Sequence, residues 1–187
     1  MTDTIEQKQA DVFNALANSL DYASEQAVPE LKKIVVTSGI GSTTDPDKIE
    51  IVQDRLAKIC AQKPVPTKAK QSISSFNIRT GDVVGYKVTL RGERMRAFLN
   101  KLIHVVLPRT KDFRGLNPES VDEMGNITIG IDEHTAFPET SDEDLENVFG
   151  LGITVVTTAE NQKEAYQYLD HLGLPFADEE AEEDSGQ

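Results

Sequence analysis

The sequence predicts an α+β fold in which helices pack on one face of a largely antiparallel sheet, with an extended basic arm attached. Two observations support this fold class. Segments with apolar residues at helical spacing are interleaved with short segments in which apolar and polar residues alternate. A polar tract with two prolines, residues 63–82, interrupts them and reads as an exposed arm or hairpin. We expect residues 1–177 to form one domain, either undivided or with two sub-lobes that share one sheet.

The first elements follow from spacing and capping residues. A helix is expected over about residues 4–21 and a strand over 32–38, which ends at the turn Gly39–Ser42. A second helix begins with Asp45 as its cap and Pro46 in its first position. Apolar residues recur at helical spacing along the first helix (Val12, Phe13, Leu16, Leu20) and the second (Ile49, Val52, Leu56, Ile59).

The clearest strand covers residues 84–91. Alternation places Val84, Tyr86, Val88 and Leu90 on one face, and Gly85, Lys87, Thr89 and Arg91 on the other. A helix over about 93–107 follows, and Pro108 is expected to end it. Two more strands, around 126–131 and 151–158, flank an acidic loop, and a last helix spans about 160–172. Residues 178–187 have nothing to bury and predict a disordered tail.

Net charge differs sharply between segments of the chain. The whole sequence carries −13, which at first argues against a nucleic-acid partner. Residues 30–115, however, contain 17 basic and 8 acidic side chains, whereas residues 116–187 contain one basic and 19 acidic side chains. Since the Debye length is about 8 Å at physiological salt, a basic face acts locally even on an acidic protein. The basic middle segment therefore favours RNA as a partner.

Patterns for other functions are incomplete. Gly39-Ile40-Gly41 begins like a dinucleotide-binding fingerprint, but Thr44 stands where the third glycine belongs. The histidines His104, His134 and His171 are scattered over three expected elements, and Cys60 ends an apolar stripe like a buried small hydrophobe. We expect no enzyme, cofactor or metal site. No apolar run is long enough for a membrane span, no secretory signal is visible, and one cysteine fits a reducing cytosol, so we expect a cytoplasmic protein.

The basic residues of the middle segment fall on three expected supports. They lie on the arm (Lys63, Lys68, Lys70, Arg79), on the polar face of the 84–91 strand (Lys87, Arg91), and in the loop after the third helix (Arg109, Lys111, Arg114). Affinity for RNA sums over such phosphate contacts. Aromatic residues are few, so base stacking on the sheet surface is not expected. The alternative is that these charges form an ordinary solvated face.

Ordered motifs in this region resemble a known family. The run QKPVPTKAK, then FNIR, KVTLRGERM, LPR and DFRGL, resembles the middle of the fifth large-subunit ribosomal protein family, in its bacterial form. Earlier, VPELKKIVVTSGIG is similar to its first strand and turn, and later GNITIGI, Phe137-Pro138-Glu139, GLGITVVTTA and LGLPF follow in order. The likeness covers about residues 28–176.

The resemblance implies a ribosomal component with several contacts. Members bind 5S rRNA in the central protuberance, beside large-subunit rRNA and other central-protuberance proteins, and an arm reaches toward peptidyl-site tRNA. Another surface meets a protein of the small-subunit head. Carried over, the rRNA-binding group is Lys33, Thr37, Gln62, Lys63, Lys87, Thr89 and Arg91. The tRNA-facing arm is Lys68, Lys70, Gln71, Ser72, Ser74 and Arg79, and the candidates for the subunit bridge are Arg109, Lys111, Arg114 and Phe137.

The chain departs from the family pattern at three places. Thr37 replaces the usual Asn, and Ala61 replaces the usual Gly, which creates strain if that turn needs a positive φ. The acidic tail has no usual counterpart, and we interpret it as a solubilising extension, with an RNA-mimicking role as the sharper alternative. The competing hypotheses for the whole chain are a non-ribosomal RNA chaperone or regulatory RNA-binding module and, more distantly, a phosphate-handling enzyme based on the Gly39–Ser42 turn.

Overall fold

A five-stranded sheet forms the centre of the structure, a computed structural model that describes residues 4–20, 22, 24–41, 46–111, 113–141 and 148–177. Neighbouring strands are all antiparallel, and their order is β2-β3-β1-β5-β4. The strands are β1 (Leu31–Gly39), β2 (Val65–Lys68), β3 (Val83–Leu90), β4 (Asn126–Ile131) and β5 (Leu151–Thr157). The first strand of the chain is therefore the central one, between two strands that come much later.

Alternation along the strands gives the sheet two unlike faces. In β1, Ile34 and Val36 are fully buried, and they lie beside Leu90 and Val88 of β3 in the antiparallel register. Every second residue of β5 is buried in the same way, beginning with Leu151. Because successive side chains of a strand point to opposite faces, the residues between them lie on the other side of the sheet. One face is thus a continuous apolar layer.

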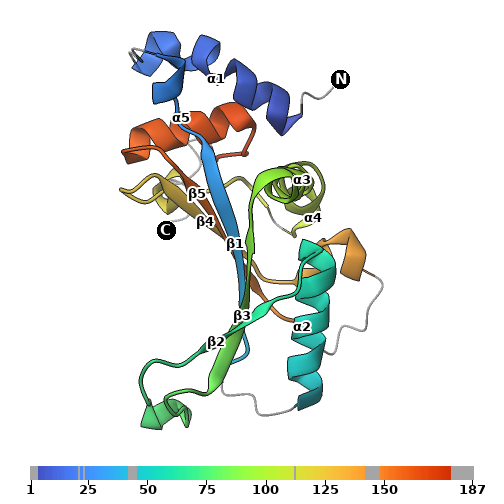
Figure 1. Cartoon of the computed structure of the whole chain (residues 1–187). Helices are drawn as coiled ribbons and strands as arrows, with labels where there is room; N and C mark the ends of the chain where they lie inside the picture. The colour runs from blue at the N-terminus through green and yellow to red at the C-terminus, as the bar shows by residue number, and fades with distance from the viewer. Residues whose placement is uncertain are drawn as a thin grey trace, which may run out of the picture.

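Helices cover the apolar face (Figure 1). α2 and α3 lie along one side of the sheet, whereas α1 and α5 pack on each other near the end where β1 begins. The helices are α1 (Ile5–Leu20), α2 (Pro46–Cys60), α3 (Gly92–Lys101), α4 (Leu107–Arg109) and α5 (Gln162–Leu172). Two single-turn helices, η5 (His134–Ala136) and η6 (Pro138–Thr140), lie in the connection between β4 and β5. This arrangement confirms the predicted fold class.

The helix after β3 extends two residues beyond its predicted end. α3 continues as a π-helical turn, η3 (Leu102–Val106), and then as α4, which contains Pro108 and ends at Arg109. The Leu107 N–H donates to the carbonyl of Leu102 in the π-helical turn, and Pro108, which has no N–H to donate, follows it without ending the helical backbone. The prediction that Pro108 ends this helix was therefore wrong.

The other predicted elements are confirmed within two residues of their ends. The strands expected over 32–38, 84–91, 126–131 and 151–158 correspond to β1, β3, β4 and β5. The polar tract forms β2 and an exposed arm, as expected. The predicted Asp45 cap and the acidic tail of residues 178–187 lie outside the described residues.

Lys101 joins three elements beneath the sheet. Its ammonium donates to the carbonyl of Ile59 near the end of α2 at 2.9 Å and forms an ion pair with Glu139 of η6. The same nitrogen lies 5.6 Å and 5.7 Å from the ring centroids of Phe98 and Phe137, within the range of a cation–π attraction. Lys101 therefore belongs to the basic middle segment, but its charge stabilises the fold and does not face a partner.

The turn after α2 holds a non-glycine residue in left-handed backbone. Ala61 has a φ of 48°, and this region costs an L-residue roughly 1–2 kcal/mol. The strain foreseen for this position is thus present. The turn brings the next residue, Gln62, against β3, where its side-chain Nε2 donates to the carbonyl of Thr89 at 3.1 Å.

Replacing Ala61 by Gly should raise the free energy of unfolding by about 1 kcal/mol, because glycine adopts a positive φ without the Cβ clash. The measurement is urea denaturation of both proteins. Ala57→Gly, within α2, is the matched control and should lower the free energy of unfolding by about 1 kcal/mol. A loss of stability in Ala61→Gly as large as in the control would contradict the strained turn.

Candidate RNA interface

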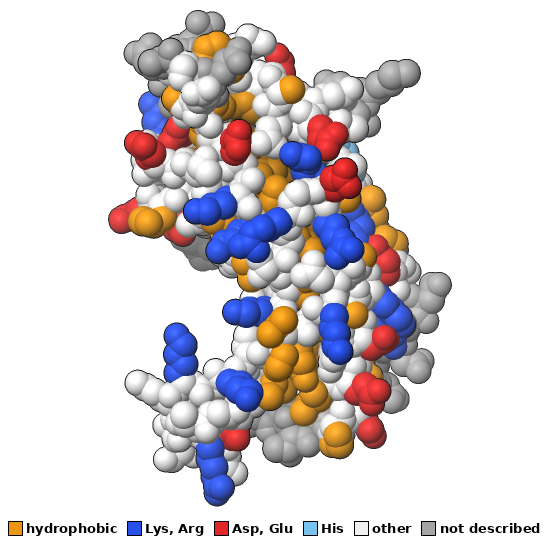
Figure 2. Space-filling view, in the orientation of Figure 1, with side chains coloured by type: hydrophobic (Ala, Val, Ile, Leu, Met, Phe, Trp, Pro, Cys, Tyr) orange, Lys and Arg blue, Asp and Glu red, His pale blue; other side chains and the backbone are white. Residues whose placement is uncertain are grey.

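The sheet face opposite the helices, here called the open face, carries small, polar and basic side chains. It comprises the outward residues of four strands: Lys33, Val35, Thr37 and Gly39 of β1, Gly85, Lys87 and Thr89 of β3, Gly152, Thr154 and Val156 of β5, and Asn126, Thr128 and Gly130 of β4. The molecule is hollowed on the side away from α2, and Lys and Arg side chains gather around this hollow (Figure 2). The sheet register therefore collects into one surface residues that are far apart in the sequence.

The register places the predicted rRNA-binding residues side by side. Lys87 lies opposite Thr37, and Thr89 lies opposite Val35. The row of Lys87 and Thr37 continues across β5 and β4 through two glycines, Gly152 and Gly130. This row therefore contains the ammonium of Lys87, the hydroxyl of Thr37 and two glycines. The two glycines leave a flat stretch of sheet on β5 and β4, next to the positively charged part of the row on β3.

Four of the predicted cations lie on the open face or at its rim. Lys87 and Arg91 are exposed, Lys63 is exposed before β2, and Lys33 is half-buried in β1. None of these four forms an ion pair with a carboxylate of the described residues. Their charges are therefore available to an external polyanion, and contacts with several phosphates would add in affinity.

The polar residues of this surface are held by internal hydrogen bonds. Thr37 donates from Oγ1 to the carbonyl of Gly152 at 3.2 Å, so its hydroxyl oxygen keeps lone pairs for an external donor. Gln62 uses its amide N–H toward Thr89, which leaves its amide oxygen as an acceptor. Both residues are thus fixed in place before a partner arrives.

Two glycines of the open face allow close approach of neighbouring groups. A Cβ at Gly85 would lie 2.5 Å from the backbone oxygen of Ser38, and one at Gly152 would lie 2.9 Å from Oγ1 of Thr37. At Gly130, by contrast, no atom lies within 4 Å of the position of a Cβ. Gly85 is therefore required by packing against backbone, whereas a Cβ at position 152 would displace the Thr37 hydroxyl and one at position 130 would meet nothing.

The arm extends beyond the body from β2 and β3 (Figure 1). The predicted residues Lys68, Lys70, Gln71, Ser72, Ser74 and Arg79 are all exposed on it. Its conformation is fixed by hydrogen bonds within the arm, including Thr80 N–H to Ser72 Oγ at 2.9 Å and two backbone bonds between Ile73 and Ile78. Phe76, the aromatic residue of the FNIR motif, is 62% exposed at the tip and was not among the predicted site residues. Its position inside a polar, exposed tract is the sequence signal that could have identified it.

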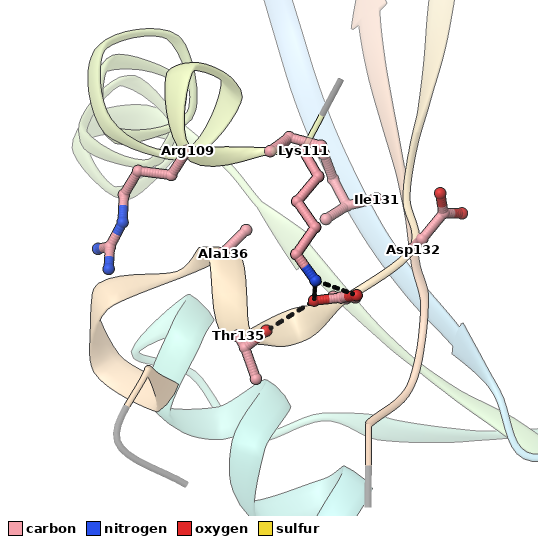
Figure 3. Close-up of a pocket in the computed structure, with 8 residues that line it drawn as sticks. Arg109, Lys111, Ile131, Asp132, Thr135 and Ala136 are labelled. Carbon is pink, nitrogen blue, oxygen red and sulfur yellow. Dashed lines mark hydrogen bonds and ion pairs between the residues drawn. The ribbon is translucent and has the colours of Figure 1, made fainter. Parts of the chain in front are cut away.

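Two of the subunit-bridge candidates, Arg109 and Lys111, line a cavity of about 210 Å³ apart from the open face. Arg109 and Lys111 leave the end of α4 and point toward η5 on either side of Ala136 (Figure 3). Lys111 pairs with Glu133 at 3.2 Å, and Arg114 is exposed. Phe137 is fully buried and stacks at 6.0 Å on Phe98. Its side chain therefore packs in the core and offers no contact surface, so its proposed bridge role is corrected to a supporting one.

Cys60 and His134, two side chains with potential reactivity, are both buried in the described part of the chain. No group of three or more His, Cys, Asp or Glu residues that could hold a metal ion occurs among these residues. Burial raises the pKa of the Cys60 thiol to about 12, against the opposing effect of the nearby Lys101 ammonium, so the thiol is not ionised at neutral pH. His134 is buried against Phe149, with the rings 4.2 Å apart. No described helix is long and apolar enough to cross a membrane.

Two protein-family models together match most of this chain. Residues 24–79 match the family described as ribosomal protein L5, and residues 83–176 match the C-terminus of the same ribosomal family. The chain belongs to the ribosomal protein L5 family. Relatives named large ribosomal subunit protein uL5 include that of Halothermothrix orenii, 46% identical over 177 residues, which cover 94% of this chain and 99% of the relative. That of Natranaerobius thermophilus is 44% identical, with 95% and 99% covered, and that of Thermotoga maritima is 45% identical, with 91% and 94% covered.

Membership of the L5 family agrees with the resemblance seen in the motifs, and the two family matches together cover residues 24–79 and 83–176. The family matches meet between residues 79 and 83, at the junction of the arm and β3. The arm and the strand that carries Lys87 therefore belong to different matched segments, although β2 and β3 pair directly in the sheet.

Substituting Ala for Gly85 should lower the free energy of unfolding by roughly 1–3 kcal/mol, because the new methyl group overlaps a backbone oxygen that cannot move away easily. Gly130→Ala, on the same face, is the matched control and should change stability by less than about 0.5 kcal/mol. Thermal or urea unfolding measures both. Equal stability of the two variants would show that the close packing of β1 and β3 at Gly85 is not as described.

Proposed function

We propose that this protein is a structural constituent of the large ribosomal subunit that binds 5S rRNA through the open face of its sheet. The observation that carries the proposal is the gathering of Lys33, Lys63, Lys87 and Arg91 on and around one uncovered sheet face, without carboxylate partners in the described part of the chain. The printed name of its relatives, large ribosomal subunit protein uL5, supports the assignment to that particle.

The electrostatic arrangement supports RNA as the ligand of this face. A phosphate backbone that meets several cations releases condensed counterions, which favours binding strongly at low salt. Thr37, Gln62 and Thr89 add neutral hydrogen-bonding groups of the kind that contact phosphate and ribose oxygens. Since the open face displays no aromatic side chain among its outward residues, we infer that it holds folded RNA through backbone and groove contacts. Large-subunit rRNA and other proteins of the central protuberance would surround this site in the ribosome.

Two further contacts complete the proposal. The exposed basic arm, from Lys68 to Arg79, contacts peptidyl-site tRNA. The arm projects beyond the body of the protein, so it can reach an RNA that the open face does not bind. Arg109, Lys111 and Arg114 contact a protein of the small-subunit head, on a surface separate from the open face. Protein recognition fits this second surface because Lys111 is already paired with Glu133, which gives the surface both signs of charge.

Replacing Lys87 or Arg91 by Ala should weaken binding to purified 5S rRNA and reduce the salt dependence by about one unit of slope for each phosphate interaction that the variant no longer makes. Gel shifts over a range of salt concentrations measure both quantities. Lys48→Ala is the matched control, because Lys48 is exposed on α2, on the helical side of the sheet, and its removal should leave the slope unchanged. An unchanged slope in Lys87→Ala and Arg91→Ala would refute the open face as the binding surface.

The chain should also prefer 5S rRNA over unrelated structured RNA of similar length and should migrate with the large subunit in high-salt gradients. A regulatory RNA-binding module would bind RNA through the same cations but would not remain with the particle. Absence of the protein from the large-subunit fractions would therefore favour that alternative.

Replacing residues 70–81 by Asn-Gly tests the role of the arm. Ala69 N–H already donates to the carbonyl of Asp82 at 2.8 Å, so a two-residue turn can close the β2–β3 hairpin there. Stability and 5S rRNA affinity should change little, because residues 71–77 are all exposed, whereas the affinity of variant large subunits for peptidyl-site tRNA should fall. A large loss of 5S rRNA affinity would show that the arm belongs to the 5S interface.

A further inference from the structure

The tip of the arm presents an apolar surface that nothing in the described chain covers. Phe76 is 62% exposed and Ile73 is 45% exposed, and both lie in or beside the single-turn helix η2 (Ser74–Phe76). Neither residue belongs to the hydrophobic core or packs against it. Two apolar side chains, one of them aromatic, are therefore exposed at the end of a projecting arm, and such a surface is suited to contact with a partner.

Hydrogen bonds hold the backbone of the tip in a defined conformation. Ile73 and Ile78 exchange two backbone hydrogen bonds of 2.9 Å and 3.2 Å, and Asn77 ends η2 in a left-handed conformation with a φ of 58°. Ser72 and Thr80 join the two sides of the arm through their hydroxyls, 3.1 Å apart. Because these bonds fix the backbone around Phe76, little conformational entropy remains to be lost when the ring binds.

The charges around the ring select an anionic partner. Lys68, Lys70 and Arg79 are exposed on the arm, and no carboxylate of the described residues forms an ion pair with them. Asp82 is the one acidic residue in the segment 65–82. Its carboxylate accepts a hydrogen bond from the backbone N–H of Arg79 at 2.8 Å. A flat apolar ring among cations is complementary to an unpaired nucleobase, which has a π face and phosphates on either side.

We propose that Phe76 stacks on an unpaired base of the RNA that the arm contacts, while the cations of the arm bind the flanking phosphates. The inference rests on the proposed contact between the arm and tRNA, and it adds the mode of recognition: the arm requires an accessible loop base, and a continuous duplex does not satisfy it. Stacking is tolerant of base identity, so the contact distinguishes loops from helices and not one loop sequence from another.

Fluorescence of the full-length variant Phe76→Trp tests the stacking directly. The natural sequence contains no tryptophan, so the new indole is the one tryptophan signal of the protein. Titration with tRNA, which offers unpaired loop bases, should quench it, whereas a long RNA duplex of equal phosphate concentration, in which all but the terminal base faces are stacked, should quench it far less. Binding of tRNA without quenching, or equal quenching by the duplex, would overturn the stacking contact.

Large subunits reconstituted with full-length variants separate this inference from the function on which it rests. Phe76→Tyr should bind peptidyl-site tRNA like the natural protein, and Phe76→Ala should bind it roughly 5- to 100-fold more weakly. Phe76→Leu should resemble Phe76→Ala, because it keeps an apolar side chain but has no ring to stack; a Leu variant with natural affinity would indicate simple apolar burial against a protein or RNA and would refute stacking.

The double variant Lys70→Ala, Arg79→Ala removes arm charge and leaves the ring. Loss of tRNA affinity in this variant, together with natural affinity in Phe76→Ala, would overturn the stacking proposal alone. Natural affinity in both would overturn the arm–tRNA contact as well. Urea midpoints close to that of the natural protein, expected because all of these residues are exposed, confirm that the comparison concerns binding and not folding.

Discussion

Burial of apolar side chains on a single face of the sheet is the constraint on which the rest of the structure depends. The strands β1, β3, β4 and β5 turn their alternate apolar residues toward the helices, and a shift of one residue in any of them would move that set to the other face. The same alternation fixes what remains outside. Lys87 and Thr37 meet on the open face because Val88 and Val36, their neighbours in the chain, meet in the core.

The separation of charge follows from this arrangement and explains how an acidic protein can present a surface for RNA. The net charge of −13 is a sum over the whole chain and does not give the charge of any one surface. Cations such as Lys63, Lys87 and Arg91 lie around the open face, whereas exposed acidic residues such as Glu119, Asp122 and Asp170 belong to later segments. Screening limits each charge to a range of about 8 Å in physiological salt. The acidic segments therefore disfavour other orientations of the protein on RNA without cancelling the attraction at the open face.

Local patterns were sufficient to predict most elements, because alternation and helical spacing are properties of neighbouring residues. The two faces of the strand that contains Lys87 followed from its sequence alone, and so did the exposure of the arm. The strand order did not, because the pairing of β1 with β5 joins segments more than a hundred residues apart. Phe137 was misjudged since a motif shows that a residue matters but not whether it is buried. The extension of the helix through Pro108 depends on a π-helical turn that no local propensity indicates.

Lysine footprinting of the full-length chain, free and bound to 5S rRNA, tests the open face most directly. Acetylation followed by mass spectrometry reports the accessibility of each lysine separately. Lys33, Lys63 and Lys87 should become protected in the complex, whereas Lys48 on α2 and Lys163 on α5, both exposed in the free protein, should react as before. Protection of Lys48 and Lys163, with Lys87 still reactive, would place the RNA on the helical side and contradict the account.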